Sequence, residues 1–129
     1  MPNYILDGKL DIEPLISTRD FLKKALKEAK TDLEIAGAVK SFEVCLELSW
    51  KICKKILNLR GTEVFTPKEV FRIAGIEGLI DNAESWFEYI DKRNRTVHDY
   101  TDDILETIYP ILPQFLKNLN TLIRNLQKL

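Results

Sequence analysis

The only histidine of the chain lies in the stretch RNRTVHDY, residues 93–100, together with two arginines, an asparagine and a tyrosine. An imidazole with a pKa of about 6.5 can take the proton of a ribose 2′-hydroxyl or return one to a leaving oxygen. A guanidinium binds phosphoryl oxygens through paired hydrogen bonds and stabilises negative charge on them. These residue types therefore suit attack on a phosphodiester, a reaction that they can carry without a metal ion.

The spacing within this stretch decides which side chains act together if the segment is helical. Arg93 and His98 are five residues apart and lie about 140° apart around a helix axis. Asn94 and His98 are four apart and share a face, so the amide can orient the imidazole and fix its tautomer. Arg93 and His98 converge if the helix ends near His98, or if a second subunit brings its own copy of the motif across a two-fold axis.

A structural explanation competes with the catalytic one, because a histidine at a helix end often contacts the terminal carbonyls. Metal binding is disfavoured, since the chain has one histidine and its two cysteines fall within a predicted helix. Asp99, Asp102 and Asp103 show no recognised ligand spacing, and we interpret them as charging the N-terminus of the following helix. We therefore expect neither a metal nor another cofactor.

The elements before the motif show helical periodicity. Residues 9–30 predict an amphipathic helix that begins between Asp11 and Pro14. The segment Thr31-Asp-Leu-Glu34 has the form of a capping box and predicts a second helix up to Leu59. The apolar positions of that second helix cover an arc wider than one partner helix would bury. It is either the central helix of a bundle or part of a dimer seam.

Three further helices follow in the pattern. A cap at Thr66 with proline at the next position predicts a short third helix, and the box-like residues 81–84 predict the start of the helix that runs into the motif. Residues 102–128 predict a last helix, in which prolines cause a kink or restart near Tyr109. No strand-like alternation rises above the helical pattern. The predicted fold is all-α, an up-and-down bundle of about five helices in a single domain over residues 1–129.

Charge and cysteine usage restrict the function classes. Nineteen Lys and Arg against twenty Asp and Glu give a formal net charge of -1, so any contact with nucleic acid must be local. Cys45 and Cys53 are about 12 Å apart along one predicted helix, too far for a disulfide, and indicate buried thiols in a reducing compartment. No leader or membrane-spanning segment is recognisable. We expect a cytoplasmic protein without a membrane partner.

Aromatic and acidic side chains outside the motif have two interpretations each. Trp50 and Trp86 could stack on bases, but their apolar helix positions favour packing in the core or at a dimer interface. Glu43 and Glu47 could line a cleft as paired carboxylates. A solvated or salt-bridged helix face is the favoured interpretation, with these partners: Lys40, Lys51 and Lys54.

Several blocks of the sequence resemble one known family. RNRTVHDY resembles the Arg-x4-His-x-Tyr motif of HEPN-domain toxins of the HepT type, whose relatives are also called nucleotidyltransferase substrate-binding proteins. The blocks at residues 38–51, 66–71 and 78–80, together with Trp86, resemble successive blocks of that family. The resemblance spans about residues 11–126.

This resemblance implies a helical bundle that forms a symmetric dimer, with two motifs meeting in a cleft at the interface. It implies the toxin subunit of a toxin-antitoxin pair, a metal-independent ribonuclease in which Arg93 and His98 carry RNA cleavage. The implied partner is a separately encoded small nucleotidyltransferase, an MntA-like antitoxin, which blocks the site by transferring AMP to Tyr100. Asn94 matches a residue common beside the motif arginine, whereas Arg95 stands where an uncharged residue is common and its role stays open.

Two alternatives remain at this point. The chain can be a non-catalytic substrate-binding subunit of a two-component nucleotidyltransferase, or an inert helical dimerisation module. It is not itself the nucleotidyltransferase, because it lacks a glycine-serine turn followed by paired aspartates that would hold metal and triphosphate. Which RNA would be cut, and which product ends would form, are also left open by the sequence.

Overall fold

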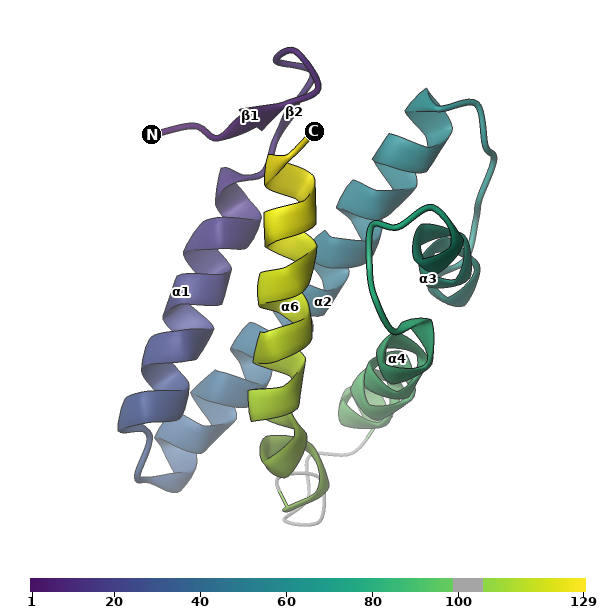
Figure 1. The fold of residues 1–129 in the computed structure, drawn as a ribbon. Coiled ribbons are helices and arrows are strands. Elements are labelled where there is room, and N and C mark those ends of the chain that lie inside the picture. Colours follow the sequence, from purple (N-terminus) through teal and green to yellow (C-terminus); the bar gives the residue numbers. More distant parts are fainter. Residues whose placement is uncertain (99–105) are drawn as a thin grey trace.

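The computed structural model describes residues 1–98 and 106–129 of the chain. The helices of the described part are α1 (Glu13–Glu28), α2 (Asp32–Leu59), α3 (Pro67–Ile76), α4 (Ala83–His98) and α6 (Leu112–Gln127), with the 3-10 turn η1 (Tyr109–Ile111) before α6 (Figure 1). The predicted all-α bundle of about five helices is confirmed.

Helix α2 begins at the predicted capping box. The Thr31 hydroxyl accepts a hydrogen bond from the backbone N–H of Glu34 at 3.2 Å, and Glu34 Oε1 accepts one from the backbone N–H of Thr31 at 3.1 Å. Hydrogen bonds from Thr31, and then one from the backbone of Lys30, hold the pKa of the Glu34 carboxyl below its ordinary value. The helix ends before Gly61, whose positive φ of 90° favours glycine.

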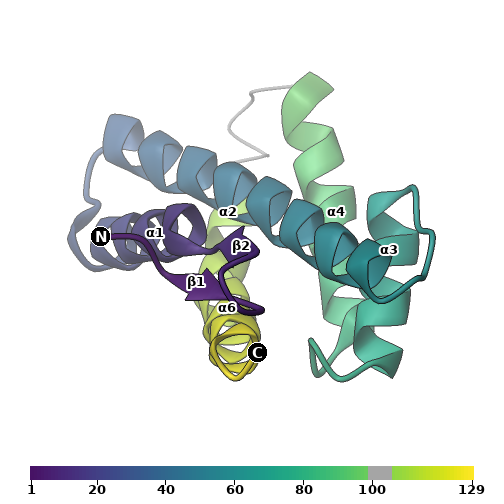
Figure 2. The same cartoon turned by 90° about the horizontal axis from the view of Figure 1, so that it is seen from above.

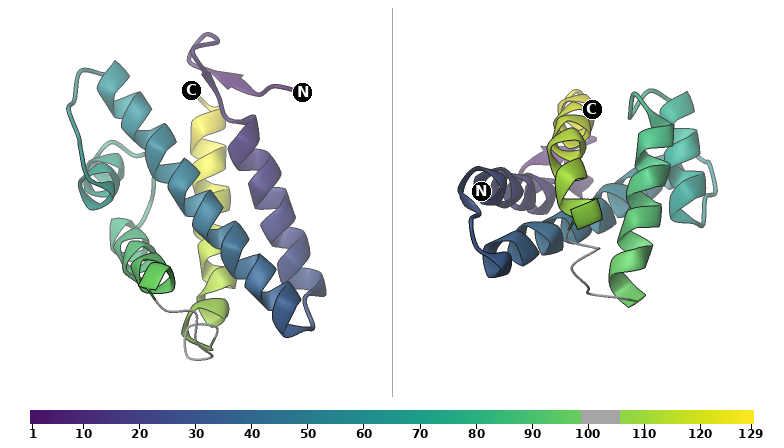
Figure 3. Two further views of the ribbon diagram at one scale, coloured as in Figure 1. Left: turned by 180° about the vertical axis from the view of Figure 1, so that it is seen from behind. Right: turned by 90° about the horizontal axis from the view of Figure 1, so that it is seen from below.

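The central position of α2 is also confirmed. It contacts α1, α3, α4 and α6, and the left view of Figure 3 shows it running diagonally across the front of the bundle. Its Phe42 ring packs edge-on against Phe115 of α6, with ring centres 4.8 Å apart. Trp86 of α4 is 1% exposed and stacks on Phe71 of α3 at 4.7 Å. Trp86 is therefore a core residue, as favoured from the sequence.

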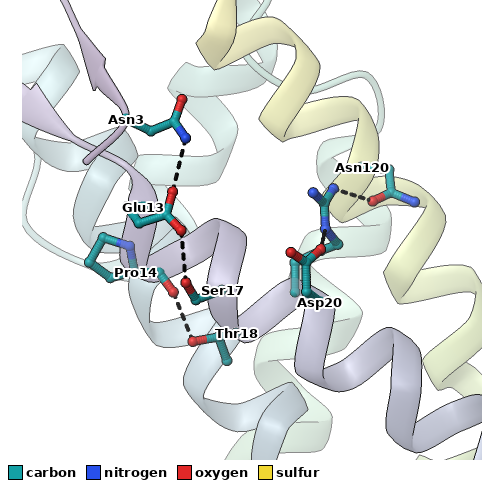
Figure 4. Close-up of polar contacts among 8 residues, drawn as sticks. Asn3, Glu13, Pro14, Ser17, Thr18, Asp20 and Asn120 are labelled. Carbon is teal, nitrogen blue, oxygen red and sulfur yellow. Dashed lines mark hydrogen bonds and ion pairs between the residues drawn. The ribbon is translucent and has the colours of Figure 1, made fainter. Parts of the chain in front are cut away.

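The N-terminal segment departs from the purely helical expectation. Strands β1 (Tyr4–Ile5) and β2 (Leu10–Asp11) form an antiparallel hairpin, too short to show an alternating pattern in the sequence. Asn3 Nδ2 donates to Glu13 Oε2 at 2.9 Å and ties this hairpin to α1 (Figure 4). Farther along α1, Arg19 Nη1 donates to Asn120 Oδ1 of α6 at 2.8 Å, so polar contacts tie α1 to the hairpin and to α6 (Figure 4).

The first residues of two other helices, α4 and α6, refine the predicted boundaries. The carboxamide Oδ1 of Asn82 accepts from the backbone N–H of Ser85 at 3.3 Å, so α4 is capped one residue later than a box at Asp81 would place it. Near Tyr109 the expected interruption takes the form of the 3-10 turn η1, which separates the helical residues 106–108 from α6.

The two cysteines are buried free thiols, as predicted. Burial raises the pKa of each thiol to about 12, and the positive charge of Arg19 only partly opposes this for Cys45. Among the described residues, no helix is both long and apolar enough to cross a membrane.

Candidate functional site at the end of helix α4

The first residues of the motif line a pocket between three helices. Arg93 and Asn94 of α4 lie there with Ile90 of the same helix, and the pocket has a volume of about 150 Å³. The other walls come from α2 and from the first residue of α3: Leu46, Glu47, Trp50 and Pro67. Larger hollows of about 260 Å³ and 490 Å³ lie elsewhere on the surface, and neither is lined by a motif residue.

The core fixes the helix that carries the motif. Trp86, Tyr89 and Ile90 are buried, and the Tyr89 hydroxyl donates a hydrogen bond to Asn118 Oδ1 of α6. On the α3 side, Lys68 Nζ lies 2.8 Å from Asp91 Oδ1. These contacts come one turn before the motif, where α4 leaves the core. Figures 2 and 3 show its last turns standing clear of the ribbon of α2.

Exposure differs along the motif. Arg93, three residues after Ile90, is half-buried, whereas Asn94 and Arg95 are exposed. Because residues three and four apart share a helix face, Arg93 continues the face that Ile90 buries. The guanidinium therefore belongs to the pocket wall, while its neighbours in sequence face solvent.

The α2 wall of the pocket carries a charge network around Glu47. Glu47 Oε2 accepts a hydrogen bond from Trp50 Nε1 at 2.9 Å, and Glu47 Oε1 lies 3.1 Å from Lys51 Nζ. Burial alone would raise the pKa of Glu47. The hydrogen bonds from Trp50 and Lys51 and the charges of Lys51 and Arg93 outweigh it and hold the pKa below its ordinary value. Glu47 is therefore ionised at neutral pH.

On the solvated or salt-bridged face predicted for α2, two of the three lysines form the expected ion pairs with Glu43 and Glu47. Lys40 Nζ lies 3.6 Å from Glu43 Oε2 one turn before the Glu47–Lys51 pair, although Glu43 is itself buried. Lys54 Nζ lies instead 5.9 Å from the centre of the Trp50 ring. Trp50 is half-buried and packs against the hydrophobic core, and its indole N–H donates to the Glu47 carboxylate.

The rest of the motif is described in part. Helix α4 runs without a break from Arg93 to His98, its last residue, so positions 93 and 98 lie about 140° apart around the axis. Position 94 lies one turn before position 98, as the proposed orienting role of Asn94 requires. Tyr100 and the three nearby aspartates, Asp99, Asp102 and Asp103, lie outside the described residues.

Three apolar residues that line the pocket were not identified from the sequence: Leu46, Pro67 and Ile90. Each has a local explanation, as a core residue or as the first residue of a helix, so nothing in the sequence pointed to a shared pocket. In the described part of the chain, no three His, Cys, Asp or Glu side chains gather closely enough to hold a metal ion.

Comparison with known proteins finds a matching family and a related protein. Residues 11–128 match the family described as nucleotidyltransferase substrate binding protein like. A protein of Haemophilus influenzae named probable ribonuclease HepT is 32% identical over 102 residues, which cover 75% of this chain and 70% of that protein.

Solved structures share the fold. A Haemophilus influenzae protein, described as showing the fold of a substrate binding domain of a nucleotidyltransferase, has a TM-score of 0.81 and 26% identity. The match covers 90% of this chain and 98% of that one. A Thermus thermophilus protein has a TM-score of 0.79 and 26% identity, over 87% of this chain and 98% of that one.

A more distant likeness joins a toxin to the same fold. The tri-AMPylated HEPN toxin of Shewanella oneidensis, in complex with an MNT antitoxin, has a TM-score of 0.70 at 14% identity, over 91% of this chain and 98% of that one. The chain belongs to the nucleotidyltransferase substrate binding protein like family and is related to the HepT-type protein of Haemophilus influenzae.

Proposed function

We propose that this protein is the toxin subunit of a toxin-antitoxin pair and cleaves RNA as a metal-independent endoribonuclease. The observation that carries the proposal is the pocket at the end of α4, where the half-buried Arg93 lies beside Asn94 on the helix that ends at His98. The relative named probable ribonuclease HepT supports the same activity.

The proposed reaction uses the side chains of the motif. His98 removes the proton of a ribose 2′-hydroxyl, and the resulting oxygen attacks the adjacent phosphorus. Arg93 stabilises the negative charge that grows on the phosphoryl oxygens. The bond from phosphorus to the 5′-oxygen breaks, and that oxygen receives a proton. Asn94, one turn before His98, orients the imidazole.

A symmetric homodimer completes the proposed site. Since α4 stays helical between Arg93 and His98, the two positions point to different sides of one helix. A two-fold axis beside the end of α4 would place Arg93 of one subunit opposite His98 of the other. Each dimer would then hold two equivalent sites.

Tyr100 is the proposed point of regulation. A separately encoded nucleotidyltransferase, an MntA-like antitoxin, transfers AMP from ATP to the tyrosine hydroxyl and releases pyrophosphate. The bulk and negative charge of the AMP group then exclude RNA from the site. The AMPylated Shewanella oneidensis toxin, in complex with its antitoxin, supports this proposal by analogy of fold.

Cleavage of labelled RNA by the purified protein in EDTA tests the activity. The wild type is expected to cut, whereas Arg93→Ala and His98→Ala variants with unchanged circular dichroism are not. Arg95→Ala is the matched control, because it removes an exposed arginine of the same helix. Cleavage that persists in His98→Ala, or that is absent from the wild type, would contradict the proposal.

A second function is favoured by the family description and by the Haemophilus influenzae substrate binding domain. In it, the chain binds a substrate for a partner nucleotidyltransferase and does no chemistry itself. Co-expression with a small nucleotidyltransferase separates the functions. Under the toxin proposal, the partner uses ATP to add AMP to the wild type but not to Tyr100→Phe. The modified wild type then no longer cleaves RNA. A stable complex without cleavage in any state would favour the binding subunit.

A further inference from the structure

We propose that Glu47 of α2 is a positioning residue for Arg93, and that its carboxylate, held by Trp50 and Lys51, directs the guanidinium within the pocket between α2, α3 and α4. The inference concerns a residue outside the motif, on a helix far from it in the sequence. It rests on the proposed role of Arg93 in cleavage.

The geometry around Glu47 supports this role. Glu47, Trp50, Arg93 and Asn94 line the same pocket of about 150 Å³. The hydrogen bond of 2.9 Å from Trp50 Nε1 and the 3.1 Å contact with Lys51 Nζ engage different oxygens of the carboxylate. Two bonds on two oxygens restrict the rotation of the side chain, so its charge has a fixed place in the pocket wall.

The Trp50 ring is held in turn. It is half-buried against the core, and Lys54 Nζ lies 5.9 Å from its centre. The donor to Glu47 is thus part of a packed side chain rather than a mobile surface group. A chain of contacts runs from the packed part of α2 to the carboxylate beside Arg93.

Electrostatics connect this carboxylate with Arg93. The charge of Arg93 is among the influences that favour the ionised form of Glu47, after the larger effects of burial, which opposes it, and of the two α2 contacts. The attraction is mutual, because arginine stays protonated at all physiological pH values. The ionised carboxylate therefore draws the guanidinium toward the α2 side of the pocket.

A fixed guanidinium matters for the proposed reaction. A free arginine side chain visits many rotamers, and only some direct its N–H groups toward a phosphate. Directing it in advance increases the stabilisation that it gives to the transition state. Glu47 lies 42% exposed at its side chain, so RNA phosphate can approach the pair without unfolding the pocket.

The first test observes the arginine directly and needs no RNA. In isotope-labelled protein, the Nε–H signal of Arg93 is assigned by its loss in Arg93→Lys. We expect this signal to shift or broaden in Glu47→Gln, and to a smaller extent in Trp50→Phe, which keeps the ring but lacks the N–H. Glu84→Gln is the matched control, because it neutralises an exposed carboxylate of α4 that does not line the pocket. An Arg93 signal unchanged in Glu47→Gln, or equally changed in Glu84→Gln, would overturn the proposal.

The second test is a double-mutant cycle on cleavage. Glu47→Gln is expected to lower the rate about tenfold in the wild type and to have little further effect in Arg93→Lys, because coupled residues do not act additively. Equal losses in both backgrounds would mean that Glu47 acts independently of Arg93. If no variant cleaves RNA but the Arg93 signal responds to Glu47→Gln, the ribonuclease proposal fails and the positioning role stands.

Discussion

At the scale of single residues, the hydrogen bond from Trp50 to Glu47 shows how one side chain serves both packing and charge. The ring supplies apolar surface on the face of α2 that meets α4, and its N–H needs an acceptor because it is partly removed from water. Glu47, three residues earlier, is within reach on the same helix face. A tryptophan that looks like a core residue thereby fixes a carboxylate at the candidate site.

Burial makes the two cysteines chemically inert in the folded protein. Cys45 and Cys53 have no exposed surface, and burial raises the pKa of each to about 12. A thiolate is needed for reaction with a chromogenic disulfide reagent. At about pH 8 we expect no reaction in the native state and reaction of both thiols after unfolding in guanidinium. Native reaction at the rate of a small free thiol would show that the core opens.

Alkaline pH should destabilise the fold through Tyr89. Burial, followed by the negative charge of Glu88, raises the pKa of the phenol from 10.0 to about 12. The unfolded state therefore loses this proton first, so stability that is complete below about pH 10 is lost as pH rises toward 12. Urea unfolding at a series of pH values should show this fall, with a smaller slope in Tyr89→Phe. An equal slope in both proteins would assign it to the two cysteines, whose raised pKa values act in the same direction.

At the scale of elements, helix ends depend on short local patterns, and the sequence predicts them well. The capping box of α2 spans four consecutive residues, and so do the cap and proline of α3. These helix starts can therefore be predicted without knowing the tertiary structure. The hairpin before α1 was not predicted, because two-residue strands contain no period. Of the residues that line the pocket, Arg93 and Asn94 were predicted as site residues, whereas for Glu47 a place in a cleft was weighed but not favoured. Which residues of α2 and α3 face them depends on how helices distant in sequence cross.

The cap of α3 gives a test of an element that builds the pocket wall. The Thr66 hydroxyl accepts from the backbone N–H of Glu69 at 3.2 Å, in front of Pro67. Thr66→Ala should lower the free energy of unfolding by about 1 kcal/mol, measured by urea titration. Thr18→Ala, which removes a hydroxyl bonded to a carbonyl within α1, serves as the control and should have a smaller effect. Equal effects would mean that the cap contributes nothing specific.

At the scale of the whole molecule, the residues that stabilise the bundle and the residues of the candidate site lie in different parts of it. Its core gathers around α2, whereas the described residues of the motif, 93–98, form the end of α4, which extends beyond α2 (Figure 2). A second copy of the chain or a different partner can approach residues at such a helix end. The same placement suits RNA, which needs access to Arg93 although the chain as a whole carries a net charge of -1.

Mixed dimers test the proposed assembly. If each site takes Arg93 from one subunit and His98 from the other, a dimer of one Arg93→Ala chain and one His98→Ala chain holds one intact site and one doubly altered site. Random mixing of equal amounts makes half of the dimers mixed, so the mixture should recover roughly a quarter of wild-type cleavage although each variant alone is inactive. If both residues act within one subunit, every site in the mixed dimer lacks one of them. The mixture would then stay inactive, with subunit exchange verified by differently tagged chains.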